Sequence, residues 1–300
     1  MTTQLAQRPA TSPAPASTIG FGNLMHSEWT KLRSVRSTYW TVIAAALSTV
    51  ALAVVICIRF RQLIGQDGPG KLDGFDPTLT SLNGIYLAQI AIGTLGVLVI
   101  TSEYATGMIR ATFSAVPQRR AVLAAKAFVF AGATFVLGEV ISFAAFGIGQ
   151  AILSGAHPDL TKGFIGADGG TVDLARDFPG LHTSASLADP GVFRAVFGAG
   201  LYLAAVGLLG FGLGAMIRHT AGALSAFFGL LFGASVITAL LPTNWRNDIM
   251  PYLPANAGSQ IFTIVLSHDA LSLWTGLGVF CLYAVAALIV GFVLAGVRDA

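Results

Sequence analysis

Residues 195–217 read AVFGAGLYLAAVGLLGFGLGAMI and contain no charged side chain. A helix needs about 20 consecutive apolar residues to cross a bilayer core of about 30 Å, because backbone amides in lipid must be satisfied within the segment. Further stretches of this kind occur at 39–58, 82–100, 127–150, 221–241 and 271–297, and their only charged residue is Glu139. We therefore predict an all-α membrane protein, a bundle of six transmembrane helices.

The composition supports a membrane protein. Of the 300 residues, 54% are hydrophobic and only 10% are charged, against about 25% charged in ordinary soluble domains. The net charge of +3 is too small to argue for nucleic acid as a partner. Residues 1–20 are rich in Ala, Pro, Ser and Thr, and we predict that they form a disordered cytoplasmic tail ahead of a six-span domain at 39–300.

The distribution of basic residues predicts the orientation. Six spans place both termini on the same side. Ten Lys or Arg and three acidic residues lie in the N-terminal region, the loop 101–126, the link 218–220 and the C-terminus. The remaining loops, 151–194 among them, hold seven Lys or Arg and ten acidic residues. Cytoplasmic loops are enriched in Lys and Arg. We expect a multi-pass protein of the cell membrane with cytoplasmic termini and an external loop 151–194, although Arg59 and Arg61 argue against this orientation.

Two segments outside the spans have an ordered pattern. Between 21 and 38, apolar residues recur at steps of three and four, which predicts an amphipathic helix lying at the membrane interface. Trp29, Lys31, Arg33 and Arg36 are its expected anchors to membrane lipids. The second segment is the loop 101–126, for which we predict a short helix over 103–113, a turn at Pro117 and then the third span.

These two segments carry a resemblance to a known family. In the first, the matching residues are Glu28-Trp29-Thr30-Lys31-Leu32 with Arg36-Ser37. In the second, they are Glu103-Tyr104-Ala105-Thr106-Gly107-Met108-Ile109-Arg110, followed by Pro117, Arg119, Arg120 and Lys126. They resemble permeases of type-2 ABC transporters, and the number and order of spans match over nearly the whole chain. The resemblance implies that 21–38 is an elbow helix and that 101–126 is a coupling loop that docks onto a separate ATPase subunit. It also implies a broken helical segment between the last two spans, in the region of Pro242 and Pro254.

The docking residues implied by this resemblance are Glu103, Gly107, Arg110, Pro117, Arg119 and Arg120, with Arg218 as a second contact. The implied function is that of the membrane subunit of an ATP-driven exporter for a drug-like, lipidic or peptide substrate. Its second permease would be another copy of this chain or a homologous one. Gly229 and Gly233 have GxxxG spacing, which fits either a helix contact within one subunit or a dimer seam.

Catalysis by the chain alone is not expected. Residues 65–72, GQDGPGKL, approach the phosphate-binding pattern GxxxxGK[ST], but Leu72 replaces the hydroxyl residue that would hold Mg²⁺. The five histidines are scattered and form no metal-binding pair. We therefore expect no enzyme activity, cofactor or metal site in this chain, with ATP and Mg²⁺ bound by the partner ATPase.

Glu139 stands out because a carboxylate within a span is costly unless it is protonated, paired or facing water. It could contact a cationic or polar substrate, or hydrogen-bond to Asn83 or Gln89 on the second span. The competing function is a carrier, channel or sensor without a motor. A carrier usually has several ionisable groups within the membrane or an internal repeat, and the single Glu139 without a repeat favours the motor-driven function.

Overall fold

The computed structural model describes residues 20–34, 36–67, 75–109, 112, 118–155, 183–264 and 270–297. Within these ranges the chain forms helices, turns and bends but no β-strand. Six of the described segments are long and apolar enough to cross a membrane, so the predicted all-α bundle of six membrane-spanning helices is confirmed. Apart from Gly20, the predicted tail lies outside the described residues, as does 156–182 of the loop 151–194.

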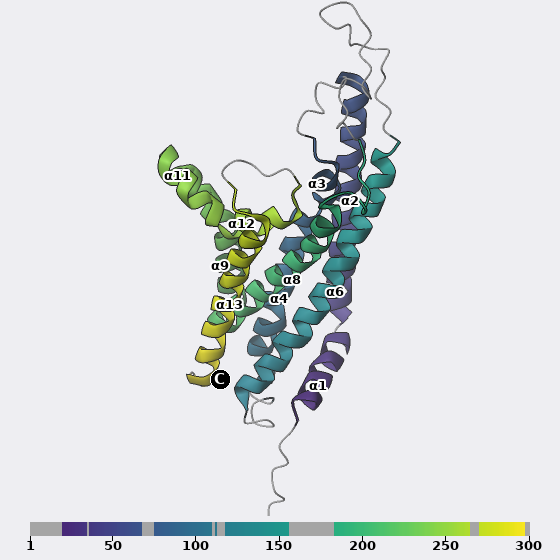
Figure 1. Cartoon of the computed structure of the whole chain (residues 1–300). Coiled ribbons are helices and arrows are strands. Elements are labelled where there is room, and N and C mark those ends of the chain that lie inside the picture. The colour runs from purple at the N-terminus through teal and green to yellow at the C-terminus, as the bar shows by residue number, and fades with distance from the viewer. Residues whose placement is uncertain are drawn as a thin grey trace, which may run out of the picture.

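The helices follow one another along the chain as α1 Phe21–Ser34, α2 Arg36–Asp67, α3 Pro77–Leu82, α4 Ile85–Ala105, α6 Arg119–Leu153, α8 Val192–Ile217, α9 Thr220–Phe228, α10 Ala234–Ala239, α11 Thr243–Ile249, α12 Pro254–Ser259 and α13 Leu273–Val297. Helices α3 and α4 together form the second span, and α9 and α10 form the fifth. Figure 1 shows α2, α4, α6, α8 and α13 side by side along the length of the bundle.

Helix α8 is the centre of the bundle and the most deeply buried of the described spans. Its glycines let neighbouring backbones approach closely. A Cβ on Gly210 would overlap the carbonyl oxygen of Gly93 in α4, and a Cβ on Gly96 would overlap that of Gly207 in α8. The stretch that decides the fold in the sequence is therefore also the packing axis of the structure.

The second span is interrupted, although we predicted it as one helix over 82–100. Asp76 caps α3 by accepting hydrogen bonds from the backbone of Thr78 and Leu79, and Pro77 occupies the first turn. The chain then turns at Asn83 and Gly84 before α4 begins. A Cβ on Gly84 would overlap the carbonyl oxygen of Thr49 in α2, so glycine is needed where the break meets the first span.

The third span is longer than its apolar stretch. It was predicted to begin at residue 127, but α6 begins at Arg119. Hydropathy excluded residues 119–126 from the span because this segment contains Arg119, Arg120 and Lys126. A helix can continue past the end of an apolar stretch when its charged side chains find partners. Lys126 finds such partners among acidic side chains, as described below.

The fifth span, predicted over 221–241, contains a π-helical turn at Gly229–Gly233, where the amide of Ala234 donates to the carbonyl of Gly229. A Cβ on either glycine would meet nothing within 4 Å. No described neighbour therefore packs closely against these two glycines, although the π-helical turn does contact α12.

Between α10 and α13 the chain forms short helices, as the resemblance implied. Helix α11 begins directly after Pro242, and α12 begins at Pro254. Ala257, Ile261 and Phe262 are fully buried, so this broken segment packs into the bundle. The segment includes the 3-10 turns Met250–Tyr252 and Gln260–Phe262.

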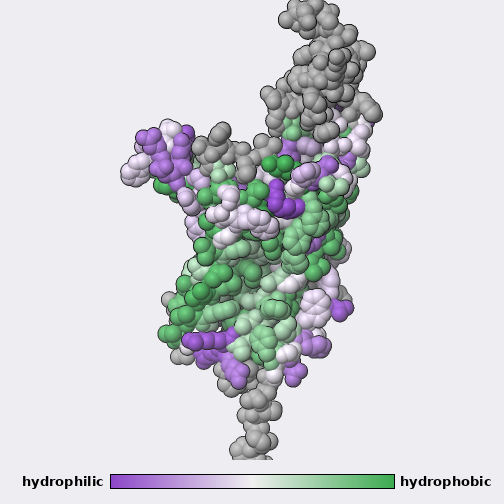
Figure 2. Space-filling model, viewed as in Figure 1, coloured by the Kyte–Doolittle hydropathy of each residue, from purple (hydrophilic) through white to green (hydrophobic). Residues whose placement is uncertain are grey.

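The bundle has two polar ends separated by an apolar middle (Figure 2). At one end lie α1, the end of α4, the start of α6 and the last residues of α13, and we call this the α1 end (Figure 1). At the opposite end lie α3, α11 and α12, of which α3 and α12 contact α8. The described residues of the predicted coupling loop and helix α1 of the predicted elbow belong to the α1 end.

Candidate functional site

Helix α1 is the amphipathic helix expected from its apolar spacing, and it packs against α6. Leu24 is buried against residues of α6, while Trp29 remains 44% exposed. Glu28, one turn after Leu24, is only 4% exposed. A buried carboxylate is costly unless a cation pairs with it.

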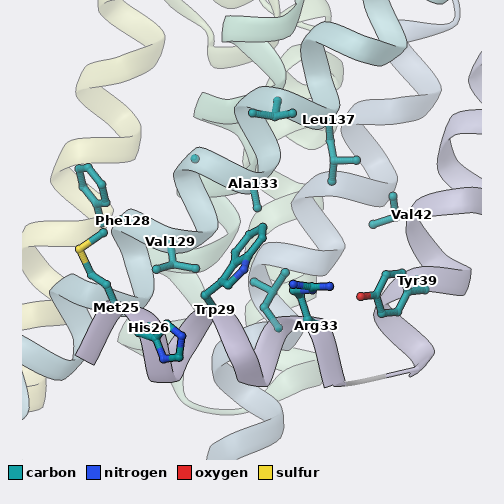
Figure 3. A pocket seen from close by; sticks show the side chains of 13 residues that line it. Met25, His26, Trp29, Arg33, Tyr39, Val42, Phe128, Val129, Ala133 and Leu137 are labelled. Carbon is teal, nitrogen blue, oxygen red and sulfur yellow. The ribbon is translucent and has the colours of Figure 1, made fainter. Parts of the chain in front are cut away.

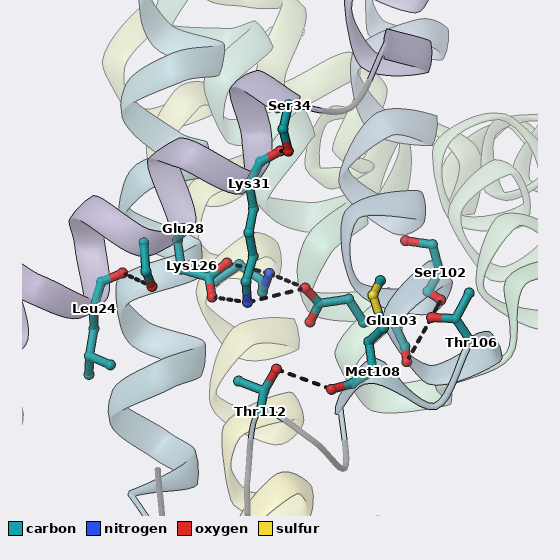
Figure 4. Close-up of polar contacts among 11 residues, drawn as sticks. Leu24, Glu28, Lys31, Ser34, Ser102, Glu103, Thr106, Met108, Thr112 and Lys126 are labelled. Atoms are coloured by element: carbon teal, nitrogen blue, oxygen red, sulfur yellow. Dashed lines mark hydrogen bonds and ion pairs between the residues drawn. The ribbon is translucent and has the colours of Figure 1, made fainter. Parts of the chain in front are cut away.

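That partner is Lys126 of α6, which donates hydrogen bonds to Glu28 Oε2 and, over 2.7 Å, to Glu103 Oε1 of α4. Lys31 of α1 donates to Glu28 Oε1 at 2.7 Å and lies 3.8 Å from Glu103 Oε1. Figure 4 shows these four side chains meeting between the three helices. We call Glu28, Lys31, Glu103 and Lys126 the ion cluster.

The ion cluster balances two carboxylates against two ammonium groups. Glu28, Glu103 and Lys126 are each less than 10% exposed, whereas the side chain of Lys31 is 44% exposed. Buried charges are tolerated when they are paired and hydrogen-bonded. The cluster therefore fastens α1 to the end of α4 and the start of α6, on both sides of the loop 101–126.

Glu103 was expected to contact an ATPase; within this chain its carboxylate is buried and pairs with Lys126 in the ion cluster. One oxygen, Oε2, is buried without a hydrogen-bond partner. The helix predicted over 103–113 does not begin at Glu103, since α4 continues to Ala105 and then ends.

Gly107 ends this helix because it adopts a positive φ of 71°, a conformation that side chains with a Cβ disfavour. Its amide donates to the carbonyl of Tyr104, the bond of a Schellman C-cap. Met108 and Ile109 resume helical geometry. Two predicted docking residues, Arg110 and Pro117, lie outside the described residues.

The other predicted docking residues gather at the α1 end. Arg119 and Arg120 open α6, and Arg120 is exposed and lies against Gly296 at the end of α13. Arg218 follows α8 with a φ of 59°, donates to the carbonyl of Leu294 at 3.0 Å and lies 5.0 Å from the ring centroid of Tyr104. Arg218 thus joins the ends of α4, α8 and α13 and is half-buried.

Two predicted anchors of α1, Trp29 and Arg33, border an apolar groove of about 790 Å³ between α1, α2 and α6. Trp29 projects toward Ala133 of α6, and Arg33 lies beside Tyr39 of α2 (Figure 3). Arg33 is exposed. The side chain of Arg36 lies outside the described residues.

Glu139 does not form either hydrogen bond expected within the bundle. Gln89 accepts a bond from the hydroxyl of Tyr202, and Asn83 donates to the carbonyl of Leu79 in its own helix. Both carboxylate oxygens of Glu139 are buried without a partner, and the carboxyl group rests against Gly200 of α8. The structural interpretation of Glu139 as a partner of Asn83 or Gln89 is therefore wrong.

A polar cluster at the opposite end was not predicted. Gln150 of α6 donates to Ser81 and to the carbonyl of Pro77, and it accepts from the amide of Ala185. Arg194 donates to the carbonyl groups of Ile261 and Thr263. Each of these residues flanks an apolar stretch, but nothing in the sequence spacing indicates their partners.

The described residues contain no group of three or more His, Cys, Asp or Glu side chains placed to hold a metal ion. The sequence matches no model of a protein family and no curated protein sequence.

Proposed function

We propose that this chain is the membrane permease subunit of an ABC exporter and that the α1 end is cytoplasmic. The observation that supports this proposal best is the ion cluster, which ties α1, α4 and α6 together at the two ends of the loop 101–126. A motor that grips this loop needs a rigid connection to the spans, and three helices held by buried ion pairs provide one.

The path of force in this proposal begins at the loop. It enters α4 through the C-cap at Gly107 and enters α6 directly at Arg119. Because Lys126 joins both helices to α1, movement of the loop displaces the three helices as a unit. Helix α8 packs against both α4 and α6, so the movement also reaches the centre of the bundle.

The partner at the loop is a separate ATPase subunit that binds ATP and Mg²⁺. Arg119 and Arg120 lie at the α1 end and suit an acidic docking surface, whereas Glu103 belongs to the internal junction. A second permease, either a copy of this chain or a homologous one, completes the transport pathway. The substrate is a drug-like, lipidic or peptide compound moved outward.

Co-purification from native membranes tests the proposal. The tagged chain is isolated in mild detergent, its partners are identified by mass spectrometry, and ATPase activity is measured. Arg119→Glu with Arg120→Glu should release the ATPase, whereas Arg59→Glu, an exposed arginine on α2, should retain it. Retention of the ATPase by all of these variants would contradict docking at the start of α6.

A carrier without a motor is the second candidate, and the unpartnered carboxylate of Glu139 favours it. An ionisable group within a span that lacks a protein partner suits proton or cation coupling. Isolation of the folded chain without any ATPase, together with uptake into proteoliposomes that depends on a proton gradient and on Glu139, would establish the carrier instead.

A further inference from the structure

The groove of about 790 Å³ between α1, α2 and α6 has an apolar floor that is open to the surroundings of the bundle (Figure 3). The floor is formed by side chains of α6 between Phe128 and Leu137. Phe128 and Val136 are 63% and 61% exposed. Because α6 is one of the membrane-spanning helices, the medium in contact with this floor is lipid hydrocarbon rather than water.

The length of the groove matches one leaflet of a bilayer. From Phe128 to Leu137 the helix rises about 14 Å, at about 1.5 Å per residue, which is about half of a hydrocarbon core of about 30 Å. Phe128 follows Lys126, whose charge belongs to the polar α1 end, by two residues. The groove therefore begins at the polar edge of the bundle and reaches about as deep as a single acyl chain.

Arg33 is a free cation at this polar edge. Its side chain is exposed and borders the groove beside Tyr39 (Figure 3). The two carboxylates of the ion cluster are paired with Lys126 and Lys31, and none of the ion pairs among the described residues includes Arg33. A guanidinium group has five N–H donors in a planar fork that fits the oxygens of a phosphate group.

The other polar groups that border the groove can also donate hydrogen bonds. His26 and Trp29 lie on the same face of α1 as Arg33, at steps of three and four residues. Their ring N–H groups and the hydroxyl of Tyr39 are donors. No acidic side chain is found among the described residues that line the groove. The polar edge therefore complements an anion and offers no partner to an ammonium group.

We propose that this groove binds one anionic glycerophospholipid. The guanidinium group of Arg33 donates to a phosphate oxygen of the lipid, and the first part of one acyl chain follows α6 past Gly132 and Val136. The sequence indicated only that α1 contacts headgroups in general, whereas this proposal assigns one bound lipid and the path of its chain. It goes beyond the proposed exporter function and does not depend on an ATPase.

The net charge of the headgroup determines which lipids complement the groove. Phosphatidylglycerol carries a phosphate and no cation, so its negative charge is available to Arg33. Phosphatidylcholine and phosphatidylethanolamine carry the same phosphate together with a cation, which would lie near Arg33 without a carboxylate to receive it. One basic side chain at the membrane surface favours an anionic lipid by about fivefold in affinity.

Native mass spectrometry of the purified full chain measures this preference. The probes are phosphatidylglycerol, phosphatidylcholine and phosphatidylethanolamine with identical acyl chains, and soluble glycerol 3-phosphate separates a lipid from a free phosphate. We expect phosphatidylglycerol to bind about fivefold more tightly than either zwitterionic lipid. Binding of a zwitterionic lipid as tightly as phosphatidylglycerol, or retention of none of the three, would overturn the proposal. Displacement of phosphatidylglycerol by an equal concentration of glycerol 3-phosphate would overturn the role of the acyl chain.

A change of charge tests the headgroup contact. Arg33→Gln should abolish the preference for phosphatidylglycerol, because the amide keeps hydrogen-bonding groups but carries no charge. Arg59→Gln removes an exposed arginine of α2 that does not line the groove, and it should keep the preference of the unmodified chain. A preference that persists in Arg33→Gln would show that another basic group binds the headgroup.

A change of volume tests the path of the chain. Gly132→Phe should fill the groove and weaken the binding of phosphatidylglycerol and phosphatidylcholine together. Gly147→Phe is the matched control, since Gly147 also belongs to α6 but does not line the groove, and a Cβ at either glycine meets nothing within 4 Å. Unchanged lipid binding in Gly132→Phe would place the lipid elsewhere and refute this site, even if Arg33→Gln failed to fold.

Discussion

Lys126 of α6 donates a hydrogen bond to Glu28 of α1, although 98 positions separate the two residues in the sequence. Both side chains are almost fully buried, and Glu103 of α4 joins them through the same ammonium group. Lys126 is therefore the buried lysine shared by two carboxylates from different helices, while the more exposed Lys31 approaches the same two groups. Its removal affects three helices at once, which makes its contribution measurable.

Lys126→Ala should destabilise the protein by about 3–5 kcal/mol, because it leaves two buried carboxylates without their shared cation. Lys31→Ala is the matched control: it removes an exposed ammonium group from the same cluster and should cost less than about 1 kcal/mol. Unfolding of both purified variants under identical detergent conditions measures the difference. Equal losses would show that burial does not determine the strength of these ion pairs.

Gly210→Ala should lower the stability of the bundle by about 1–3 kcal/mol, the usual cost of forcing extra atoms into a packed interior. The new methyl group would overlap the carbonyl oxygen of Gly93 and push α8 away from α4. Gly132→Ala in α6, where a Cβ meets nothing within 4 Å, should remain within about 1 kcal/mol of the original stability. A comparison of their thermal unfolding midpoints checks the close contact between α4 and α8.

Gly107→Val should cost about 1–2 kcal/mol, because a β-branched residue disfavours the positive φ of this helix end. A Cβ at this position meets no other atom within 4 Å, so the penalty comes from the backbone alone. Gly107→Asn should cost less, since asparagine tolerates the left-handed conformation. If both variants unfold at the same temperature as the original protein, the chain does not end α4 in this way in solution.

Glu139→Gln should reduce transport while leaving thermal stability unchanged, because glutamine keeps the shape of the side chain and removes only its charge. Accumulation of a panel of fluorescent lipophilic compounds in cells that express each variant measures transport. Tyr202→Phe, which removes the hydrogen bond to Gln89, is a control for a purely structural polar contact. Transport at the original level in Glu139→Gln would assign this carboxylate no role in the pathway.

The sequence predicts the spans well because the length of an apolar stretch is a local property. Ala195–Ile217 lies within α8, and residues 271–297 differ from α13 by only two positions. The start of the third span was missed because hydropathy treats Lys126 as incompatible with a buried helix. The close contact at Gly84 was missed because the atom it meets, the carbonyl oxygen of Thr49, lies on another helix.

The site was predicted only in part for the same reason. Glu28, Glu103 and Lys126 all belong to the segments that carried the resemblance, but a sequence gives no distance between residues on different helices. Glu103 was consequently assigned to a partner protein, whereas it pairs within the chain. The unpartnered oxygens of Glu139 were also invisible, because Asn83 and Gln89 find other partners in the fold.

The ion cluster also orders the steps of biosynthesis. The ribosome makes Glu28 well before Lys126, and until then only the exposed Lys31 of the same helix can pair with this carboxylate, which is too little to bury it. Helix α1 therefore cannot settle into its final position when it leaves the insertion machinery. Its docking must wait for the third span. The N-terminal helix is therefore synthesised before the other described helices but packs into the bundle only after α6 has been inserted.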